Sequence, residues 1–167
     1  LPADRILSIG SGIDYFDVVG FVNAASGDGD NWRPFRKSSL ESINTLCDTY
    51  GLNGLRSINV AACVASTQSM GLAYRILKKT KKKIAVTGGA DSMLSHLHYI
   101  GFYKLGALSE WTGDPSRACR PFDVYRPEIV LGEGAAVYLF QNEEEAPRGK
   151  ILAEVKGYAS TMDAYMV

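Results

Sequence analysis

A change in hydrophobic spacing at Cys63 separates a predicted strand from a predicted helix. Ile58 and Val60 are β-branched and alternate with smaller or polar residues, which is typical of a buried strand. Beyond Cys63, apolar residues follow the i, i+3, i+4, i+7 spacing of one helical face: Met70, Ala73, Tyr74 and Leu77. The pattern therefore predicts a strand, a sharp turn and a helix, with Cys63 at the turn.

The same reading along the rest of the chain predicts further elements. A buried strand is expected over Arg5–Ile13, and a helix from Ser38 or Ser39 to about Tyr50, ended by Gly51. Further strands are predicted in the following ranges: 84–90, 135–140 and, beginning at Ile151, 151–155. Strands that alternate with helices indicate an α/β fold with a mostly parallel sheet.

The predicted position of Cys63 favours a reactive thiol. The unpaired N–H groups and the positive dipole end of the following helix stabilise a thiolate, which is the nucleophilic form of cysteine. The alternative is a buried, inert thiol, which is common for a free cysteine. The strand–cysteine–helix pattern alone leaves these two interpretations about equally favoured.

Composition limits the class of protein. The 167 residues are 46% hydrophobic, as in a globular protein, and the 18 basic residues balance the 18 acidic ones, so no general attraction to nucleic acid is indicated. No apolar run has the length of a membrane span. Cys47, Cys63 and Cys119 are widely spaced, which argues against a zinc site or a disulfide framework and fits a reducing cytoplasm.

Several other motifs do not predict a nucleotide-binding or metal-binding site. Gly10-Ser-Gly12 lacks the third glycine of a dinucleotide loop, and no phosphate-loop lysine follows, so we expect no nucleotide cofactor. The lysine run over 78–83 is expected to be solvated. His96 and His98 are two residues apart, which is poor spacing for metal ligands, and we interpret them as structural.

An ordered set of short motifs resembles one enzyme family. The motifs are Gly10-Ser-Gly12, Ala62-Cys63, Thr87-Gly-Gly-Ala-Asp91, Ala107-Leu-Ser109, Arg120-Pro-Phe-Asp123, Leu131-Gly-Glu-Gly-Ala135 and Asp163-Ala-Tyr165. In this order and spacing the chain resembles a β-ketoacyl-acyl-carrier-protein synthase of the elongating type.

The resemblance implies a thiolase-like α/β fold. That fold has two similar βαβαβαββ halves in a five-layered α/β/α/β/α sandwich. We expect residues 1–145 to form most of the N-terminal half, and residues 146–167 to form a linker and the first strand of the second half. The family's catalytic histidines lie in the second half, so we expect this chain to be a segment of a longer protein.

The resemblance also implies a reaction and a nucleophile. Cys63 would accept an acyl group from an acyl-carrier-protein thioester. The carbanion formed when malonyl-carrier protein loses carbon dioxide would then attack the acyl-cysteine. A thiolate both attacks and leaves well, which divides a difficult carbon–carbon bond formation into two steps. The backbone N–H of Cys63 is the expected donor to the oxyanion.

Other roles are likewise implied only by the resemblance. Ile13 and Val64 would line the acyl-chain pocket. Arg126 would bind the acyl carrier protein, together with Arg33, Arg36 and Lys37 in a second region. Glu133 is interpreted as a structural acid. The partners expected are an acyl carrier protein and a second ketosynthase subunit, identical or related, with residues near Ile58 to Ala61 at the dimer contact. No metal and no cofactor are expected.

The sequence departs from the family at Val64, where relatives have a small residue, and at Pro127-Glu-Ile129, where they commonly have Asp-Gly-Phe. Two alternatives to the elongating synthase therefore stay open. One is a thiolase or a chain-initiating synthase that uses coenzyme A thioesters. The other is a non-catalytic ketosynthase-like scaffold subunit.

Overall fold

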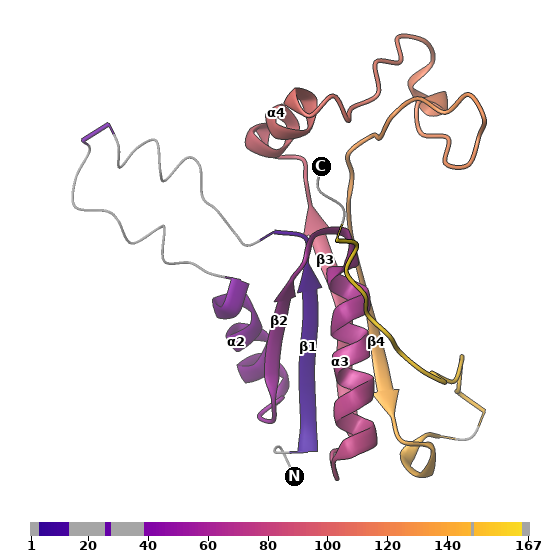
Figure 1. Cartoon of the computed structure of the whole chain (residues 1–167). Coiled ribbons are helices and arrows are strands. Elements are labelled where there is room, and N and C mark those ends of the chain that lie inside the picture. Colours follow the sequence, from indigo (N-terminus) through magenta and orange to yellow (C-terminus); the bar gives the residue numbers. More distant parts are fainter. Residues whose placement is uncertain (1–3, 14–25, 28–38, 148, 165–167) are drawn as a thin grey trace. The chain divides into compact units, whose positions relative to one another are not determined.

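The computed structural model describes residues 4–13, 26–27, 39–147 and 149–164 (Figure 1). The chain divides into two compact units. The first consists of Leu1–Ala90 together with Ala135–Val167, and the second is Asp91–Gly134. The predicted division near residue 145 does not coincide with these units, and it stays a prediction.

A four-stranded sheet organises the first unit. Its strands are β1 (Arg5–Ser11), β2 (Arg56–Val60), β3 (Ile84–Ser92) and β4 (Glu133–Gln141), in the order β2-β1-β3-β4. Strand β1 pairs in parallel with both β2 and β3, whereas β4 runs in the opposite direction (Figure 1). The predicted mostly parallel α/β sheet is therefore confirmed.

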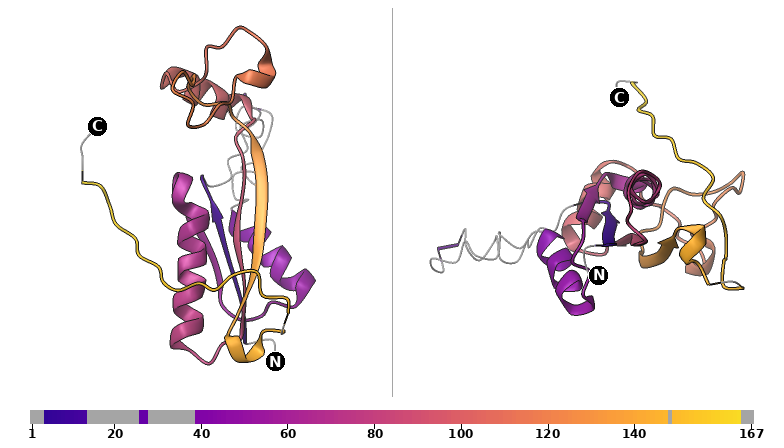
Figure 2. Two further views of the ribbon diagram at one scale, coloured as in Figure 1. Left: turned by 90° about the vertical axis from the view of Figure 1, so that its right-hand side faces the viewer. Right: turned by 90° about the horizontal axis from the view of Figure 1, so that it is seen from below.

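Two helices cover opposite faces of this sheet (Figure 2). Helix α3 (Ala65–Lys79) packs on one face through a buried cluster of Ile6, Ala73, Leu77 and Ala85. Helix α2 (Ser39–Tyr50) packs on the other face through a second cluster of Leu7, Ile43, Cys47 and Leu52. The side chains of Ile6 and Leu7 point to opposite faces of the sheet, because successive side chains of a strand alternate between its two faces.

The ends of the helices follow from local chemistry. Helix α2 begins at Ser39 and ends at Tyr50, as predicted. Gly51 follows with φ at +62°, a left-handed conformation that glycine adopts without steric cost. Helix α3 is preceded by the short 3₁₀ turn η3 (Ala62–Val64), which carries Cys63.

The first turn of α3 lies unusually close to the sheet. A Cβ atom added to Gly10 of β1 would lie 2.3 Å from the carbonyl carbon of Ala65, and one added to Gly89 of β3 would lie 1.8 Å from the Ser66 Oγ. The small residues of both strands therefore let the helix approach the carboxyl end of the sheet.

The second unit contains helix α4 (His96–Lys104) and a loop that includes the short turn η4 (Pro115–Arg117). Ser95 caps α4, and its Oγ lies 2.9 Å from His98 Nδ1. This contact fits the interpretation of His98 as a structural residue.

Arg120 organises the loop of the second unit. Its guanidinium stacks over Trp111 at 5.0 Å from the ring centroid and donates a hydrogen bond of 2.9 Å to the Tyr125 carbonyl. Another of its nitrogen atoms lies 3.7 Å from Asp123. The Arg-Pro-Phe-Asp motif therefore holds this loop together through its first and last residues.

The strand beginning at Ile151, expected as the first strand of the second half of the fold, stays a prediction. Residues 151–164 have no regular secondary structure, and Leu152 is 94% exposed. A strand needs a neighbouring strand for its backbone hydrogen bonds, and none of the described strands pairs with this segment. The segment instead contacts α3, where the Tyr158 ring packs at Gly71 and Arg75 lies 4.7 Å from its centroid.

The contact between Gly10 and Ala65 gives a test of the fold. The substitution Gly10→Ala is expected to lower the free energy of unfolding by about 2–3 kcal/mol, because the new methyl group would overlap backbone atoms that cannot rotate away. Thermal or denaturant unfolding measures this change. Gly157→Ala is the matched control, since nothing lies within 4 Å of its added Cβ, and it should change stability by less than about 0.5 kcal/mol. Equal stability of the two variants would contradict the close approach.

Candidate active site

Cys63 lies in the 3₁₀ turn η3, between the carboxyl end of β2 and the start of α3. Figure 1 shows both of these elements in the first unit. Its side chain is exposed to solvent. The predicted strand–cysteine–helix arrangement is confirmed, and the alternative of a buried thiol does not describe Cys63. Ligands of parallel α/β sheets commonly bind at this carboxyl edge.

The backbone before the cysteine is strained. Ala62 has φ at +48°, a left-handed conformation that costs a residue with a Cβ roughly 1–3 kcal/mol. The Ala62 N–H donates a hydrogen bond of 3.0 Å to the Gly12 carbonyl, which fixes the turn to the loop after β1. Such strain persists where surrounding contacts enforce it, and it is typical of active sites.

Hydrogen bonds within the turn occupy the backbone amides next to Cys63. The Val64 N–H donates to the Ala61 carbonyl at 3.3 Å, and the Ala65 N–H donates to the Ala62 carbonyl. With Ala62 bound to Gly12, these bonds engage the amides on both sides of Cys63. The Cys63 amide itself is the one predicted to donate to an oxyanion.

Apolar side chains lie around this turn. Ile13 directly follows the Gly12 carbonyl that binds Ala62, and its side chain is 38% exposed, while Val64 is 52% exposed. The structure therefore brings Ile13 and Val64 to the same region as Cys63. Their predicted role in lining an acyl pocket stays a prediction.

The three cysteines differ in their surroundings. Cys47 is buried between α2 and the sheet, and this burial raises the pKa of its thiol above the ordinary value, although the nearby Arg56 guanidinium acts in the opposite direction. Cys119 is exposed like Cys63, but it lies in the loop of the second unit. The inert, buried interpretation therefore applies to Cys47.

Hydrogen-bonding side chains lie beneath the turn. Asn59 Nδ2 donates to Ser69 Oγ at 2.7 Å, and Ser8 Oγ donates to the Ser69 carbonyl at 3.2 Å. Sequence reasoning missed these residues. The available signal was an asparagine within an apolar strand, four residues before the cysteine.

Arg126 lies in the second unit and is exposed. Its guanidinium donates a hydrogen bond of 3.2 Å to the Asp123 carbonyl, and it lines a shallow, open hollow with Val124, Pro127 and Glu128. Glu128 places a negative charge in the same hollow. The other predicted carrier-binding residues, Arg33, Arg36 and Lys37, lie outside the described residues.

Glu133 accepts a hydrogen bond of 2.9 Å from the Ser92 hydroxyl, which links the end of β3 to the start of β4. This contact fits a structural acid. Within the described residues, no group of three or more His, Cys, Asp or Glu side chains is arranged to hold a metal ion.

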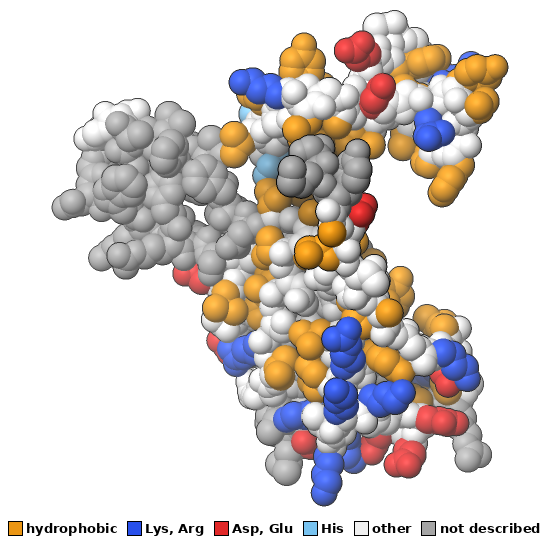
Figure 3. Space-filling view, in the orientation of Figure 1, with side chains coloured by type: hydrophobic (Ala, Val, Ile, Leu, Met, Phe, Trp, Pro, Cys, Tyr) orange, Lys and Arg blue, Asp and Glu red, His pale blue; other side chains and the backbone are white. Residues whose placement is uncertain are grey.

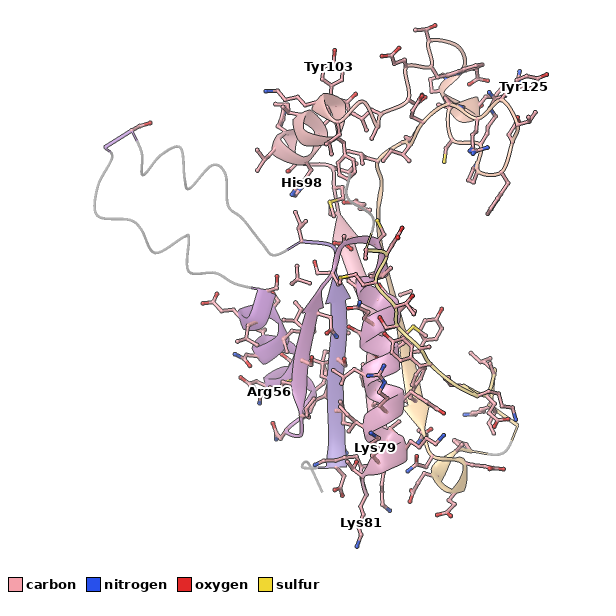
Figure 4. The ribbon with its side chains drawn as sticks, viewed as in Figure 1. Arg56, Lys79, Lys81, His98, Tyr103 and Tyr125 are labelled. Carbon is pink, nitrogen blue, oxygen red and sulfur yellow. The ribbon has the colours of Figure 1, made fainter. Side chains whose placement is uncertain are left out.

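The lysine run forms a separate surface at the other end of α3. Lys79 and Lys81 lie at the foot of the first unit, where basic side chains gather (Figures 3 and 4). A helix of 15 residues is about 22 Å long, so this basic surface is far from Cys63. No helix in the described part of the chain is both long and apolar enough to cross a membrane.

Comparison with known sequences identifies the family. Residues 19–146 match the family described as the β-ketoacyl synthase N-terminal domain. The chain belongs to the β-ketoacyl synthase family. It is 37% identical over 132 residues to 3-oxoacyl-[acyl-carrier-protein] synthase 2 of Synechocystis sp., a match that covers 78% of this chain and 30% of the relative.

Another relative gives a similar result. The protein of the same name from Staphylococcus aureus is 37% identical over 119 residues, which are 70% of this chain and 29% of that protein. The chain thus matches only about 30% of the length of these β-ketoacyl synthases.

Solved structures confirm the thiolase-like fold of the ketosynthases. A β-ketoacyl synthase from Burkholderia phymatum aligns with a TM-score of 0.73 at 23% identity, covering 85% of this chain and 36% of that one. A type II polyketide ketosynthase, solved in complex with its acyl-carrier protein, aligns with a TM-score of 0.67 at 20% identity, covering 86% and 38%.

Proposed function

We propose that this chain is the nucleophile-bearing part of a 3-oxoacyl-acyl-carrier-protein synthase. The enzyme would join an acyl group to a malonyl unit by decarboxylative Claisen condensation, in fatty acid or polyketide biosynthesis in the cytoplasm. The observation that carries this proposal is the exposed Cys63 in a strained turn at the start of α3. Membership of the β-ketoacyl synthase family supports the same assignment.

The first half-reaction is transfer of the acyl group to Cys63. The Cys63 thiolate attacks the thioester carbonyl of an acyl carrier protein, and the tetrahedral oxyanion accepts a hydrogen bond from the Cys63 N–H. The carbon–sulfur bond to the carrier then breaks. The carrier leaves as a thiol after it takes up a proton, and the acyl group remains on Cys63 as a thioester.

The second half-reaction forms the carbon–carbon bond. A malonyl-carrier thioester loses carbon dioxide, and the electron pair of the broken bond becomes an enolate. The enolate carbon attacks the acyl-Cys63 carbonyl, and the Cys63 thiolate leaves. Ile13 and Val64 would contact the alkyl part of the acyl group, since both present apolar side chains near the turn.

Acylation of Cys63 is the first prediction of this function. Exposure of the full-length protein to an acyl-carrier-protein thioester should give one acyl adduct by intact mass, and Cys63→Ala should give none. Cys47 should stay unmodified, because its burial and raised pKa keep it protonated and inaccessible.

Acyl-coenzyme A, tested as a second acyl donor, separates the elongating synthase from a thiolase, a chain-initiating synthase and a scaffold. An adduct from acyl-coenzyme A alone would contradict an elongating synthase and indicate a thiolase or a chain-initiating synthase. No adduct from either donor, in protein that circular dichroism shows to be folded, would contradict the enzymatic function and indicate a scaffold.

Carrier binding by Arg126 is tested by reversing its charge. An acyl carrier protein is expected to be acidic, so Arg126→Glu should raise KM for the carrier-bound substrate about fivefold and leave kcat unchanged. Lys81→Glu, a charge reversal at the exposed lysine run, is the matched control and should leave KM unchanged. Equal KM values for Arg126→Glu and the unaltered protein would contradict a carrier contact at Arg126.

We also propose that the enzyme forms a homodimer, or a heterodimer with a related ketosynthase subunit. Strand β2 supports this proposal because it lies at the end of the described sheet, and Val60 beside the Cys63 turn is exposed. A second subunit would contact residues near Ile58 to Ala61. Light scattering of the full-length protein should give the mass of a dimer, and a monomer at micromolar concentration would contradict the proposal.

A further inference from the structure

We propose that Asn59 and Ser69 are positioning residues for Cys63. Their side-chain hydrogen bond holds together the two arms of the turn on which Cys63 lies. This inference rests on the proposed function of Cys63 as a nucleophile, and it assigns a role to two residues that contact no substrate.

The bond spans the turn directly. Asn59 lies in β2, four residues before Cys63, and Ser69 lies in α3, six residues after it. Asn59 Nδ2 donates to Ser69 Oγ at 2.7 Å, which is short for a hydrogen bond between an amide and a hydroxyl. The bond therefore closes a loop of chain that contains the whole of η3.

Burial makes the Asn59–Ser69 hydrogen bond costly to break. Ser69 is fully buried and Asn59 is half-buried. Where water is excluded, a hydrogen bond is stronger, and a polar group that loses its partner is penalised. The Ser69 carbonyl also accepts the bond from Ser8 of β1, so this residue of the helix is tied to two strands of the sheet.

The Asn59–Ser69 hydrogen bond acts on Cys63 through Ala62, the strained residue beside it. Ala62 adopts its left-handed conformation only while contacts on both sides enforce it. The bond of Ala62 to Gly12 fixes the middle of the turn, and the Asn59–Ser69 bond fixes the distance between its ends. If the ends separate, Ala62 can relax, and both the thiol and the amide of Cys63 then change direction.

Apolar packing alone would not fix the orientation of the first turns of α3. The hydrophobic clusters hold α3 against the sheet farther along the helix, at Ala73 and Leu77. Such contacts depend weakly on rotation of the helix, whereas a hydrogen bond requires one distance and one direction. A polar pair close to the nucleophile is therefore suited to set the orientation of the first turns of α3.

The experiment is a double-mutant cycle in the full-length protein. Asn59→Ala, Ser69→Ala and the double variant are compared for the rate of Cys63 acylation by an acyl-carrier thioester. Each single substitution should slow acylation about fivefold, which corresponds to one net hydrogen bond. The double variant should be no slower than either single variant, because all three lack the same bond.

Ser8→Ala is the matched control. It removes a hydrogen bond to the same buried residue of α3, but that bond lies outside the Cys63 turn. It should lower the melting temperature as much as Asn59→Ala does, while the acylation rate stays within about twofold of the unaltered protein. Slowing equal to that of Asn59→Ala, or additive losses in the double variant, would overturn the proposal.

Alkylation by iodoacetamide separates failure of this inference from failure of the proposed function. The ratio of Cys63 to Cys119 alkylation should fall in Asn59→Ala and Ser69→Ala, and stay constant in Ser8→Ala, whether or not any acyl donor reacts. An unchanged ratio across all variants would overturn the positioning role. If Asn59→Ala does not fold, Asn59→Leu, which is similar in volume, replaces it and should give the same fall.

Discussion

The close approach of α3 to the carboxyl end of the sheet is the constraint on which the candidate site depends. The backbone at Ala65 lies so near Gly10 that no side chain fits between them. Because the helix starts against the strands, the chain leaving β2 has only the short turn η3 in which to reverse direction. The left-handed Ala62 and the exposed Cys63 follow from that short connection. The close contact thus couples packing of the core to presentation of the thiol.

The strain at Ala62 is offset by hydrogen bonds of comparable size. A left-handed alanine costs roughly 1–3 kcal/mol, and each net hydrogen bond contributes roughly 0.5–1.5 kcal/mol. The two bonds from Ala62 to Gly12 and from Asn59 to Ser69 are therefore of the size needed to keep the turn in place. Polar residues lie inside this small core because a hydrogen bond fixes the orientation of α3 on the sheet, which apolar contacts do only weakly.

Sequence periodicity predicted the elements whose hydrophobic faces are completed within this chain. Helix α2, with Ser39 at its start and Gly51 after its end, and the strand–turn–helix around Cys63 are examples. The segment from Ile151 forms no strand within the described residues, because alternation gives a strand only where a neighbour can pair with it. The Asn59–Ser69 contact could not be predicted, since the pairing of two polar residues ten positions apart depends on where the helix lies on the sheet.

The conformation of Ala62 also limits which residues can precede the nucleophile as the gene changes. A single-base change in an alanine codon yields glycine, serine, threonine, valine, proline, aspartate or glutamate. Proline is excluded because its φ is fixed near −65°, and the β-branched valine and threonine fit a positive φ poorly. Glycine fits without strain but allows the turn many other shapes. Position 62 therefore disfavours proline, valine and threonine, although alanine itself carries only a methyl group.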